Sequence, residues 1–165
     1  MKIILASGNK GKLAEFQQLL SSYEIEVLPQ SALGIESPPE TGLTFIENAL
    51  IKARYAAEQS GLPALADDSG LSIDALGGEP GIYSARYAGD GASDQDNIDR
   101  VLDKLRNVAQ PERKATFNCV LALLRHDQDP TPIVCHGQWQ GEILEQPSGQ
   151  GGFGYDPVFW LPSLQ

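Results

Sequence analysis

Near its start the chain reads KIILASGNKGKLAEFQQLLSS, residues 2–22. The apolar run at residues 2–6 predicts a β-strand, and residues 13–22 place Leu13, Phe16, Leu19 and Leu20 at near-helical spacing. The polar residues 7–12 between them predict a loop. A strand, a loop and a helix in this order are typical of an α/β fold, in which helices cover a sheet.

This loop is a candidate anion site. Its residues are Ser7, Gly8, Asn9, Lys10, Gly11 and Lys12. The backbone N–H groups and the positive dipole end of a following helix favour a phosphate, glycines permit close approach, and lysines add positive charge. The spacing differs from the phosphate loop G-x-x-x-x-G-K-[ST], so a plain helix-start turn remains the alternative.

Composition excludes several classes of function. The 165 residues include 22 acidic and 12 basic side chains, for a net charge of −10, so the surface should repel a nucleic acid polymer but not a small anion in a basic pocket. No apolar run approaches the roughly 20 residues that span a bilayer, and no signal peptide is visible. We expect a single cytoplasmic domain over residues 1–165 without membrane contact, and we expect Cys119 and Cys135 to be reduced core thiols.

Helical and strand patterns alternate along the rest of the chain. Residues 44–60 open with a capping box, Thr44 to Glu47, and stop at Gly61, which predicts a helix. A second helix is expected from Ser93 to about Gln110. Strands are expected at residues 26–28, 62–66, 71–76, 115–125, 133–136 and 139–144, the last two as an antiparallel pair around Gly137. The fold class is therefore α/β with one mixed sheet.

Two adjacent acids stand at a turn expected between two of these strands. Asp67 and Asp68 are flanked by aliphatic residues. Such pairs are most often solvated turns or caps, which is the favoured interpretation for Asp67. A carboxylate held between apolar strands needs a cation or hydrogen-bond donors. Lys52 would be surface charge unless its helix faces a pocket, and Glu40 would be an ordinary exposed acid.

A glycine-rich segment at residues 149–157 completes the candidate site. Such a loop can approach a flat ligand, with Phe153 and Tyr155 available for stacking; an ordinary turn whose rings fill the core is the alternative. Three features together indicate hydrolysis of a nucleotide phosphate. They are a loop that can bind phosphate, a carboxylate that can hold a divalent cation or deprotonate water, and a second loop that can hold a nucleotide base.

Five motifs, in order along essentially the whole chain, carry a family resemblance. They are SGNKGK at 7–12, ETGLTFIENA at 40–49 with Lys52, ADDSGL at 66–71, GIYSARY at 81–87 and GGFGYDP at 151–157. This set resembles the Ham1-type inosine/xanthosine triphosphate pyrophosphatases. The resemblance implies an elongated mixed sheet with an active-site cleft between two lobes. It also implies a Mg²⁺-dependent homodimer that hydrolyses ITP, dITP and XTP to the monophosphate and pyrophosphate and so keeps them out of DNA and RNA.

The same resemblance assigns roles to individual residues. Asp68 would be the proton acceptor and a Mg²⁺ ligand, with Glu40 as a second ligand. The loop at residues 7–12 and Lys52 would bind the phosphates. Ser69 would contact the substrate. The base pocket would be lined by Phe153, Gly154, Tyr155 and Asp156.

Family members continue into a helical segment that carries a Lys and a Ser-His-Arg triplet, whereas this sequence ends at residues 160–165. Two alternatives follow from the residues. One is a C-terminally truncated, weakly active or inactive form that binds nucleotide or serves as a dimer partner. The other is a sugar-phosphate phosphatase, whose product would be orthophosphate.

Overall fold

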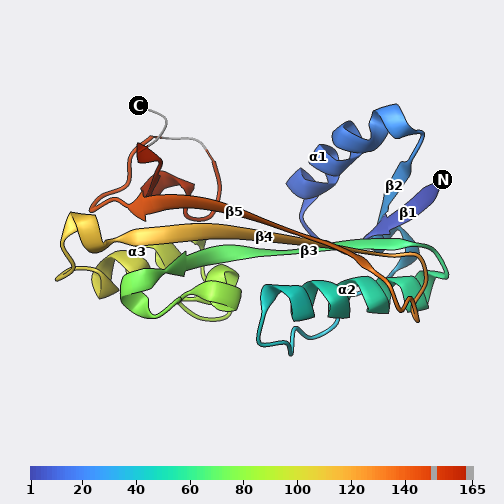
Figure 1. The fold of residues 1–165 in the computed structure, drawn as a ribbon, viewed down its shortest axis with the longest axis horizontal. Coiled ribbons are helices and arrows are strands. Elements are labelled where there is room, and N and C mark those ends of the chain that lie inside the picture. Colours follow the sequence, from blue (N-terminus) through green and yellow to red (C-terminus); the bar gives the residue numbers. More distant parts are fainter. Residues whose placement is uncertain (150–151, 163–165) are drawn as a thin grey trace. The chain divides into compact units, whose positions relative to one another are not determined.

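The computed structural model describes residues 1–149 and 152–162, over which six strands form one mixed sheet in the order β2-β1-β3-β4-β5-β6 (Figure 1). The strands are β1 (Lys2–Leu5), β2 (Glu26–Pro29), β3 (Ala64–Ile73), β4 (Lys114–Leu124), β5 (Ile133–Ile143) and β6 (Phe159–Trp160). Strand β1 runs parallel to β2 and β3, and β5 runs antiparallel to β6. Helices α1 (Lys10–Leu20), α2 (Phe45–Ser60) and α3 (Asp94–Lys104) flank the sheet. The expected α/β fold with a mixed sheet is confirmed.

The chain forms two compact units. The first contains residues 1–68 and 120–136, and the second contains residues 69–119 together with the described residues from 137 onward. In the first unit, α1 packs through Leu13, Phe16 and Leu20 against one set of strand residues, and α2 packs against another. Because alternate side chains of a strand point to opposite faces, the two helices cover opposite faces of the sheet (Figure 1).

Helix α2 begins and ends where the sequence predicts. The Thr44 hydroxyl accepts a hydrogen bond from the Glu47 N–H at 3.1 Å, and Gly61 follows the last turn with φ of 67°. Its buried face consists of small residues that let the helix approach the sheet closely: Ala49, Ala53, Ala56 and Ala57, each at most 2% exposed. A long side chain on this face cannot easily escape to solvent, which matters below for Lys52.

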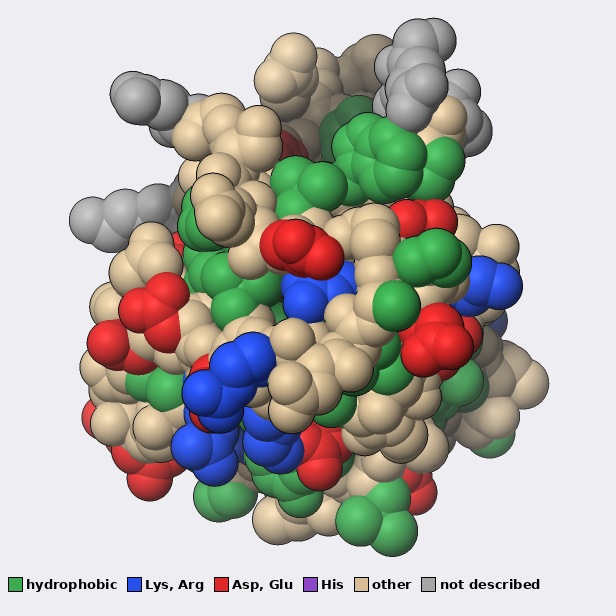
Figure 2. Space-filling view, turned by 90° about the vertical axis from the view of Figure 1, so that its left-hand side faces the viewer, with side chains coloured by type: hydrophobic (Ala, Val, Ile, Leu, Met, Phe, Trp, Pro, Cys, Tyr) green, Lys and Arg blue, Asp and Glu red, His purple; other side chains and the backbone are tan. Residues whose placement is uncertain are grey.

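The second unit has its own core around α3. Ser93 and Asp96 form a capping box at its start, and Ile98, Val101 and Leu105 pack into that core. The helix ends at Lys104, earlier than the expected Gln110. Figure 2 shows a face on which several Lys and Arg side chains lie close together, while other basic side chains and the acidic ones are spread over the rest of the face. Local positive surface therefore exists on a chain of net charge −10.

Three further expectations, two about strands and one about the cysteines, are wrong. Residues 62–76 do not form two strands around a turn: β3 runs without a break through Asp67 and Asp68, and ends at Ile73. Likewise β5 is one strand through Gly137 rather than a hairpin. Polar and glycine residues that signal turns locally are here paired within the sheet. Cys119 and Cys135 are free thiols, as expected, but both are exposed rather than in the core.

A buried carboxylate anchors the turn after β4 and makes stability depend on pH. Asp129 is 2% exposed and accepts hydrogen bonds from the Arg125 backbone and guanidinium and from the Thr131 N–H. The Arg125 guanidinium holds the pKa of Asp129 well below its ordinary value. The folded state thus favours the ionised form, and this stabilisation is present above the ordinary Asp pKa of about 4 and is lost as the pH falls further.

We therefore expect Asp129→Asn to lower the thermal unfolding midpoint at pH about 7, where the carboxylate of the wild type is fully ionised. The difference between variant and wild type should shrink as the pH falls below about 4. Circular dichroism melts over this pH range measure both. A difference that stays constant with pH would contradict the assignment of the effect to the ionised carboxylate.

Candidate active site

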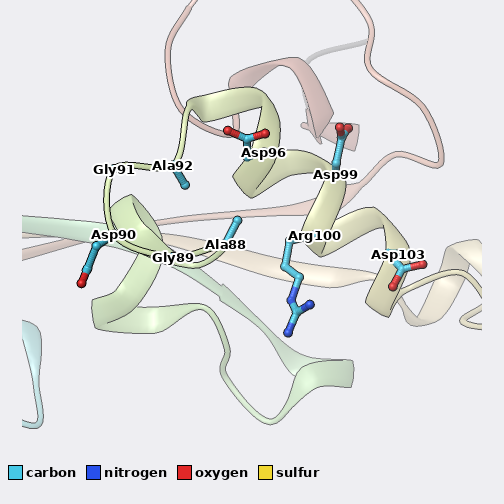
Figure 3. Close-up of a pocket in the computed structure, with 9 residues that line it drawn as sticks. All are labelled: Ala88, Gly89, Asp90, Gly91, Ala92, Asp96, Asp99, Arg100 and Asp103. Atoms are coloured by element: carbon cyan, nitrogen blue, oxygen red, sulfur yellow. The ribbon is translucent and has the colours of Figure 1, made fainter.

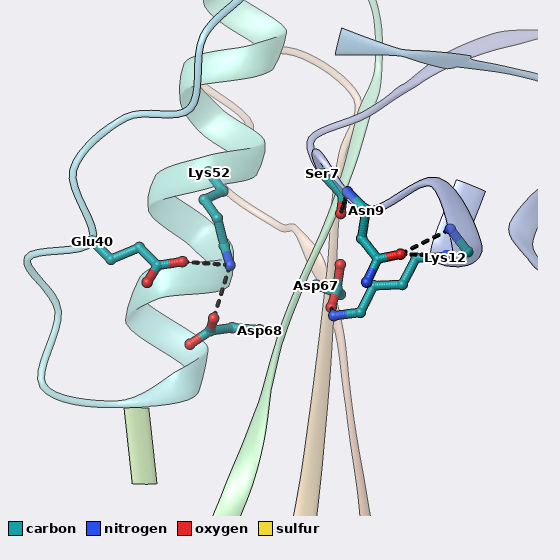
Figure 4. A network of polar contacts seen from close by, with 8 residues as sticks. Ser7, Asn9, Lys12, Glu40, Lys52, Asp67 and Asp68 are labelled. Carbon is teal, nitrogen blue, oxygen red and sulfur yellow. Dashed lines mark hydrogen bonds and ion pairs between the residues drawn. The ribbon is translucent and has the colours of Figure 1, made fainter. Parts of the chain in front are cut away.

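Two clusters of polar side chains lie in the first unit, one on each side of β3 (Figure 4). The clusters start from two neighbouring residues of that strand, Asp67 and Asp68. Since successive residues of a strand point to opposite faces, one carboxylate meets the start of α1 and the other meets α2. The acid pair is buried, at 4% and 8% exposure, so the solvated-turn interpretation of Asp67 is wrong.

Asp68 belongs to a carboxylate-ammonium-carboxylate cluster. The Lys52 Nζ donates to Asp68 Oδ1 at 2.8 Å and to Glu40 Oε1 at 2.9 Å. Lys52 comes from the buried alanine-rich face of α2, Asp68 from β3 and Glu40 from the loop before α2 (Figure 4). Lys52 is 9% exposed, because that face lies against the sheet. It is not the surface charge that composition alone favours.

Burial controls the protonation of this cluster. It raises the pKa of Asp68 above its ordinary value, and the hydrogen bond from Lys52 only partly offsets this effect. For Lys52, burial lowers the pKa, but the hydrogen bonds to Asp68 and Glu40 outweigh it and raise the pKa above its ordinary value. The Oδ2 atom of Asp68 is buried and has no hydrogen-bond partner among the described residues. A carboxylate of raised pKa with one uncommitted oxygen is suited to accept a proton.

Asp67 pairs with the predicted anion loop. It forms an ion pair with the Lys12 ammonium, at the start of α1. The loop is shaped by Asn9, whose Oδ1 accepts the N–H groups of Gly11 at 2.8 Å and Lys12 at 3.2 Å, while the Ser7 hydroxyl accepts the Asn9 N–H at 3.2 Å. The structure thus brings Ser7, Asn9 and Lys12 together beside a buried carboxylate. The side chain of Lys10 lies outside what the structure describes.

The remaining predicted residues belong to the second unit. Ser69 is exposed in β3. Phe153 is 65% exposed, and its N–H donates to the Asp156 carboxylate at 2.9 Å. Tyr155 is 4% exposed and donates its hydroxyl to the Ser84 carbonyl at 2.8 Å. The core interpretation therefore describes Tyr155, while the ring of Phe153 is open to solvent. The residues 150–151 of the same loop lie outside the described part.

A pocket in the second unit is a poor alternative site for an anion (Figure 3). It has a volume of about 540 Å³ and is formed by the loop 88–92 and one face of α3. Its charged lining residues are Asp90, Asp96, Asp99, Arg100 and Asp103. Four carboxylates against one guanidinium disfavour a phosphate-bearing ligand, and none of the predicted site residues lies there.

Comparison with known proteins identifies the family of this chain. The model of the Ham1 family matches residues 3–165. The chain belongs to the Ham1 family. It is 62% identical over 164 residues to a protein of Halorhodospira halophila named dITP/XTP pyrophosphatase, covering 99% of this chain and 82% of that protein. A protein of the same name from Yersinia pseudotuberculosis is 60% identical, with 99% and 83% covered.

Solved Ham1 structures have the same fold. A HAM1 protein from Coxiella burnetii superposes with a TM-score of 0.95 at 53% identity, covering 99% of this chain and 83% of that chain. A dITP/XTP pyrophosphatase from Mycobacterium abscessus gives 0.85 at 42% identity, with 96% and 83% covered. Over the described residues of this Ham1 chain, no helix is long and apolar enough to cross a membrane.

Two residues of the site have no role in the sequence prediction. Asp67 was expected in a solvated turn, and Asn48 is quoted in the family motif without a role. Asn48 precedes Lys52 by four residues and therefore lies on the same buried face of α2. That helical spacing is a signal that could have pointed to Asn48. Nothing local in the sequence indicates the ion pair of Asp67 with Lys12.

Proposed function

We infer that this Ham1 protein hydrolyses the non-canonical purine nucleoside triphosphates dITP, XTP and ITP to the monophosphate and pyrophosphate, and so keeps them out of DNA and RNA. Relatives named dITP/XTP pyrophosphatase at about 60% identity over nearly the whole chain support this substrate class. The structural observation that carries the chemistry is buried Asp68, with one oxygen held by Lys52 and the other uncommitted.

The site residues of the first unit have these proposed parts in the reaction. Asp68 Oδ2 accepts the proton of the water that attacks the α-phosphorus, because its raised pKa suits a general base. Lys52 and Lys12 hold the phosphate groups and offset the charge that develops as pyrophosphate leaves. Ser7, Gly8, Asn9, Lys10 and Gly11 present the loop to the same phosphates. This assignment uses the loop as an anion site rather than as a plain helix start.

Glu40 and Asp68 also fit a divalent cation. Mg²⁺ prefers oxygen ligands and is commonly held by one or two carboxylates together with substrate phosphates. Among the described residues no group of three or more His, Cys, Asp and Glu side chains is arranged to hold a metal, which suits an ion shared with the substrate. Ham1 pyrophosphatases are metal-dependent hydrolases, and we propose Mg²⁺ here, held by Glu40 and Asp68. When bound, the ion would neutralise charge on the phosphate oxygens.

Further proposed substrate contacts, which rest on the family motifs, lie in the second unit. Phe153 offers an exposed ring on which a purine can stack, and Gly154 and Asp156 belong to the same loop. Tyr155 supports this loop from the core through its bond to Ser84. Ser69 is a further proposed substrate contact.

We propose that the protein works as a cytoplasmic homodimer. The location follows from the substrate, since nucleoside triphosphates are used for nucleic acid synthesis there. Strand β5 carries exposed apolar side chains at Ile133 and Val134, and a partner chain that covered them would remove apolar area from water.

An assay of the reaction products tests the function. With Mg²⁺ present, dITP and XTP should each yield one pyrophosphate per monophosphate, and dGTP should react far more slowly. Removal of divalent cations with a chelator should stop the reaction. Coupled detection of pyrophosphate and, separately, of orthophosphate distinguishes the two product types. Orthophosphate as the first product would instead identify a phosphatase.

A further inference from the structure

A buried side chain of α2 holds the backbone of the loop that carries Glu40. Asn48 is 0% exposed, and its Oδ1 accepts the N–H of Gly42 at 2.8 Å. Gly42 stands two residues after Glu40. A Cβ atom at Gly42 would lie only 2.6 Å from Glu47 Cβ and 2.7 Å from Asn48 Oδ1. The loop backbone therefore rests directly on Asn48, at a position where a side chain does not fit.

The other end of the Asn48 amide is not committed. Its Nδ2 is buried and has no hydrogen-bond partner among the described residues, although buried amide groups nearly always have one. Asn48 and Lys52 lie four residues apart on the buried face of α2, and Lys52 contacts Asp68 directly. An amide held in the interior with an unused donor is costly for stability alone, which favours a role in the site.

We propose that Asn48 is a positioning residue, which fixes Glu40 opposite Asp68 by holding the Gly42 backbone. The distance between the two carboxylates is set by three contacts in series. Asn48 holds Gly42, Lys52 bridges Glu40 and Asp68, and both Asn48 and Lys52 project from the same rigid face of α2. The helix therefore sets the spacing of the two carboxylates: Lys52 holds the Glu40 side chain, and Asn48 holds the loop backbone that carries it.

Two substitutions break this contact from opposite sides. Asn48→Leu keeps the size of the side chain and removes both polar atoms. Gly42→Ala leaves Asn48 intact but pushes the loop away from it, because the added Cβ overlaps Asn48 and Glu47. Gly137→Ala is the matched control, since the only atom near its added Cβ is the Cys119 carbonyl oxygen at 3.9 Å. If Asn48→Leu fails to fold, Gly42→Ala carries the test by itself.

The first measurement is the binding of Mn²⁺ to the protein without nucleotide, followed by electron paramagnetic resonance. Residues that orient metal ligands typically cost about 10–100-fold in metal affinity or activity when replaced, and we expect a loss of this size for both variants but not for Gly137→Ala. The double variant should be no weaker than the worse single one, because both changes act on the same contact. Wild-type Mn²⁺ affinity in either variant would overturn the proposal.

The second measurement separates positioning from folding. At a temperature where the variants are folded, kcat for dITP should fall in parallel with Mn²⁺ affinity while KM stays near that of the wild type. A purely structural Asn48 would lower only the unfolding midpoint, and that result would also overturn the proposal. This kinetic part rests on the proposed function. A wild-type protein that releases no pyrophosphate would refute the function, whereas the Mn²⁺ titration would still decide the role of Asn48.

Discussion

Asp68→Asn should release pyrophosphate from dITP roughly 10²–10⁴ times more slowly than the wild type, the range expected for loss of a general base. The amide has nearly the same shape as the carboxylate, so Lys52 keeps an oxygen acceptor where Asp68 Oδ1 now lies. The uncommitted position, however, can no longer take a proton. Nucleotide binding, measured by isothermal titration calorimetry, should remain detectable because Lys12 and Lys52 are unchanged.

Asp103→Asn is the control for this experiment. Asp103 is an exposed residue of α3 that pairs with Arg106 at 3.1 Å, and exposed ion pairs of this kind contribute little. The turnover of Asp103→Asn should match that of the wild type. Near-normal turnover of Asp68→Asn, under conditions in which the control behaves as expected, would remove Asp68 from the role of base.

Lys52→Met should make the stability of the protein depend on divalent cations. The substitution keeps a side chain of similar length on the buried face of α2 but leaves Glu40 and Asp68 without the ammonium that bridges them. Breaking a buried ion pair costs up to about 5 kcal/mol because the remaining charge is uncompensated. A cation held by the same two carboxylates replaces the lost charge, so added Mg²⁺ should restore much of the unfolding midpoint. Turnover should fall as well, since a phosphate contact is lost.

Thermal melts with and without Mg²⁺ measure this effect, and Lys104→Met provides the comparison. Lys104 pairs with the exposed Glu79, and this ion pair is far less shielded from water than that of Lys52. Loss of the Lys104 ammonium should therefore change neither the unfolding midpoint nor the response of the midpoint to Mg²⁺. A Lys52→Met protein that is as stable as the wild type, or that responds to Mg²⁺ no more than the wild type does, would show that Lys52 is not the counterion of the two acids.

The sequence predicts those elements whose signals are local. Helix α2 is recognisable because Thr44 and Gly61 mark its two ends by side-chain and backbone chemistry within a few residues. The course of β3 is not recognisable in this way, because Asp67 to Gly70 has the composition of a turn. What keeps this segment extended is pairing within the sheet and the lysines that meet the acids from α1 and α2, and these partners are far away in sequence.

The candidate site likewise has a part that the sequence predicts and a part that it does not. Residue types and motif order are sufficient to select Asp68, Glu40, Lys52 and the loop at residues 7–12. The burial of Lys52 depends on the alanines around it, whose effect appears only when α2 rests on the sheet. The contribution of Asn48 depends on a loop backbone that lies against it. Such contacts are tertiary: the spacing of Asn48 and Lys52 indicates a shared helix face, but not the loop backbone that lies against it.

The two neighbouring acids of β3 have a consequence for how this chain can vary. Because a strand alternates its faces with a period of two residues, gain of a single residue in the first half of β3 would move Asp67 into the place of Asp68, beside Lys52. Asp68 would turn to the opposite face, two residues beyond the place beside Lys12 that Asp67 had left. Lys52 would keep a carboxylate partner and Lys12 would lose one, so we expect a change of chain length in this strand to disturb the loop at residues 7–12 first.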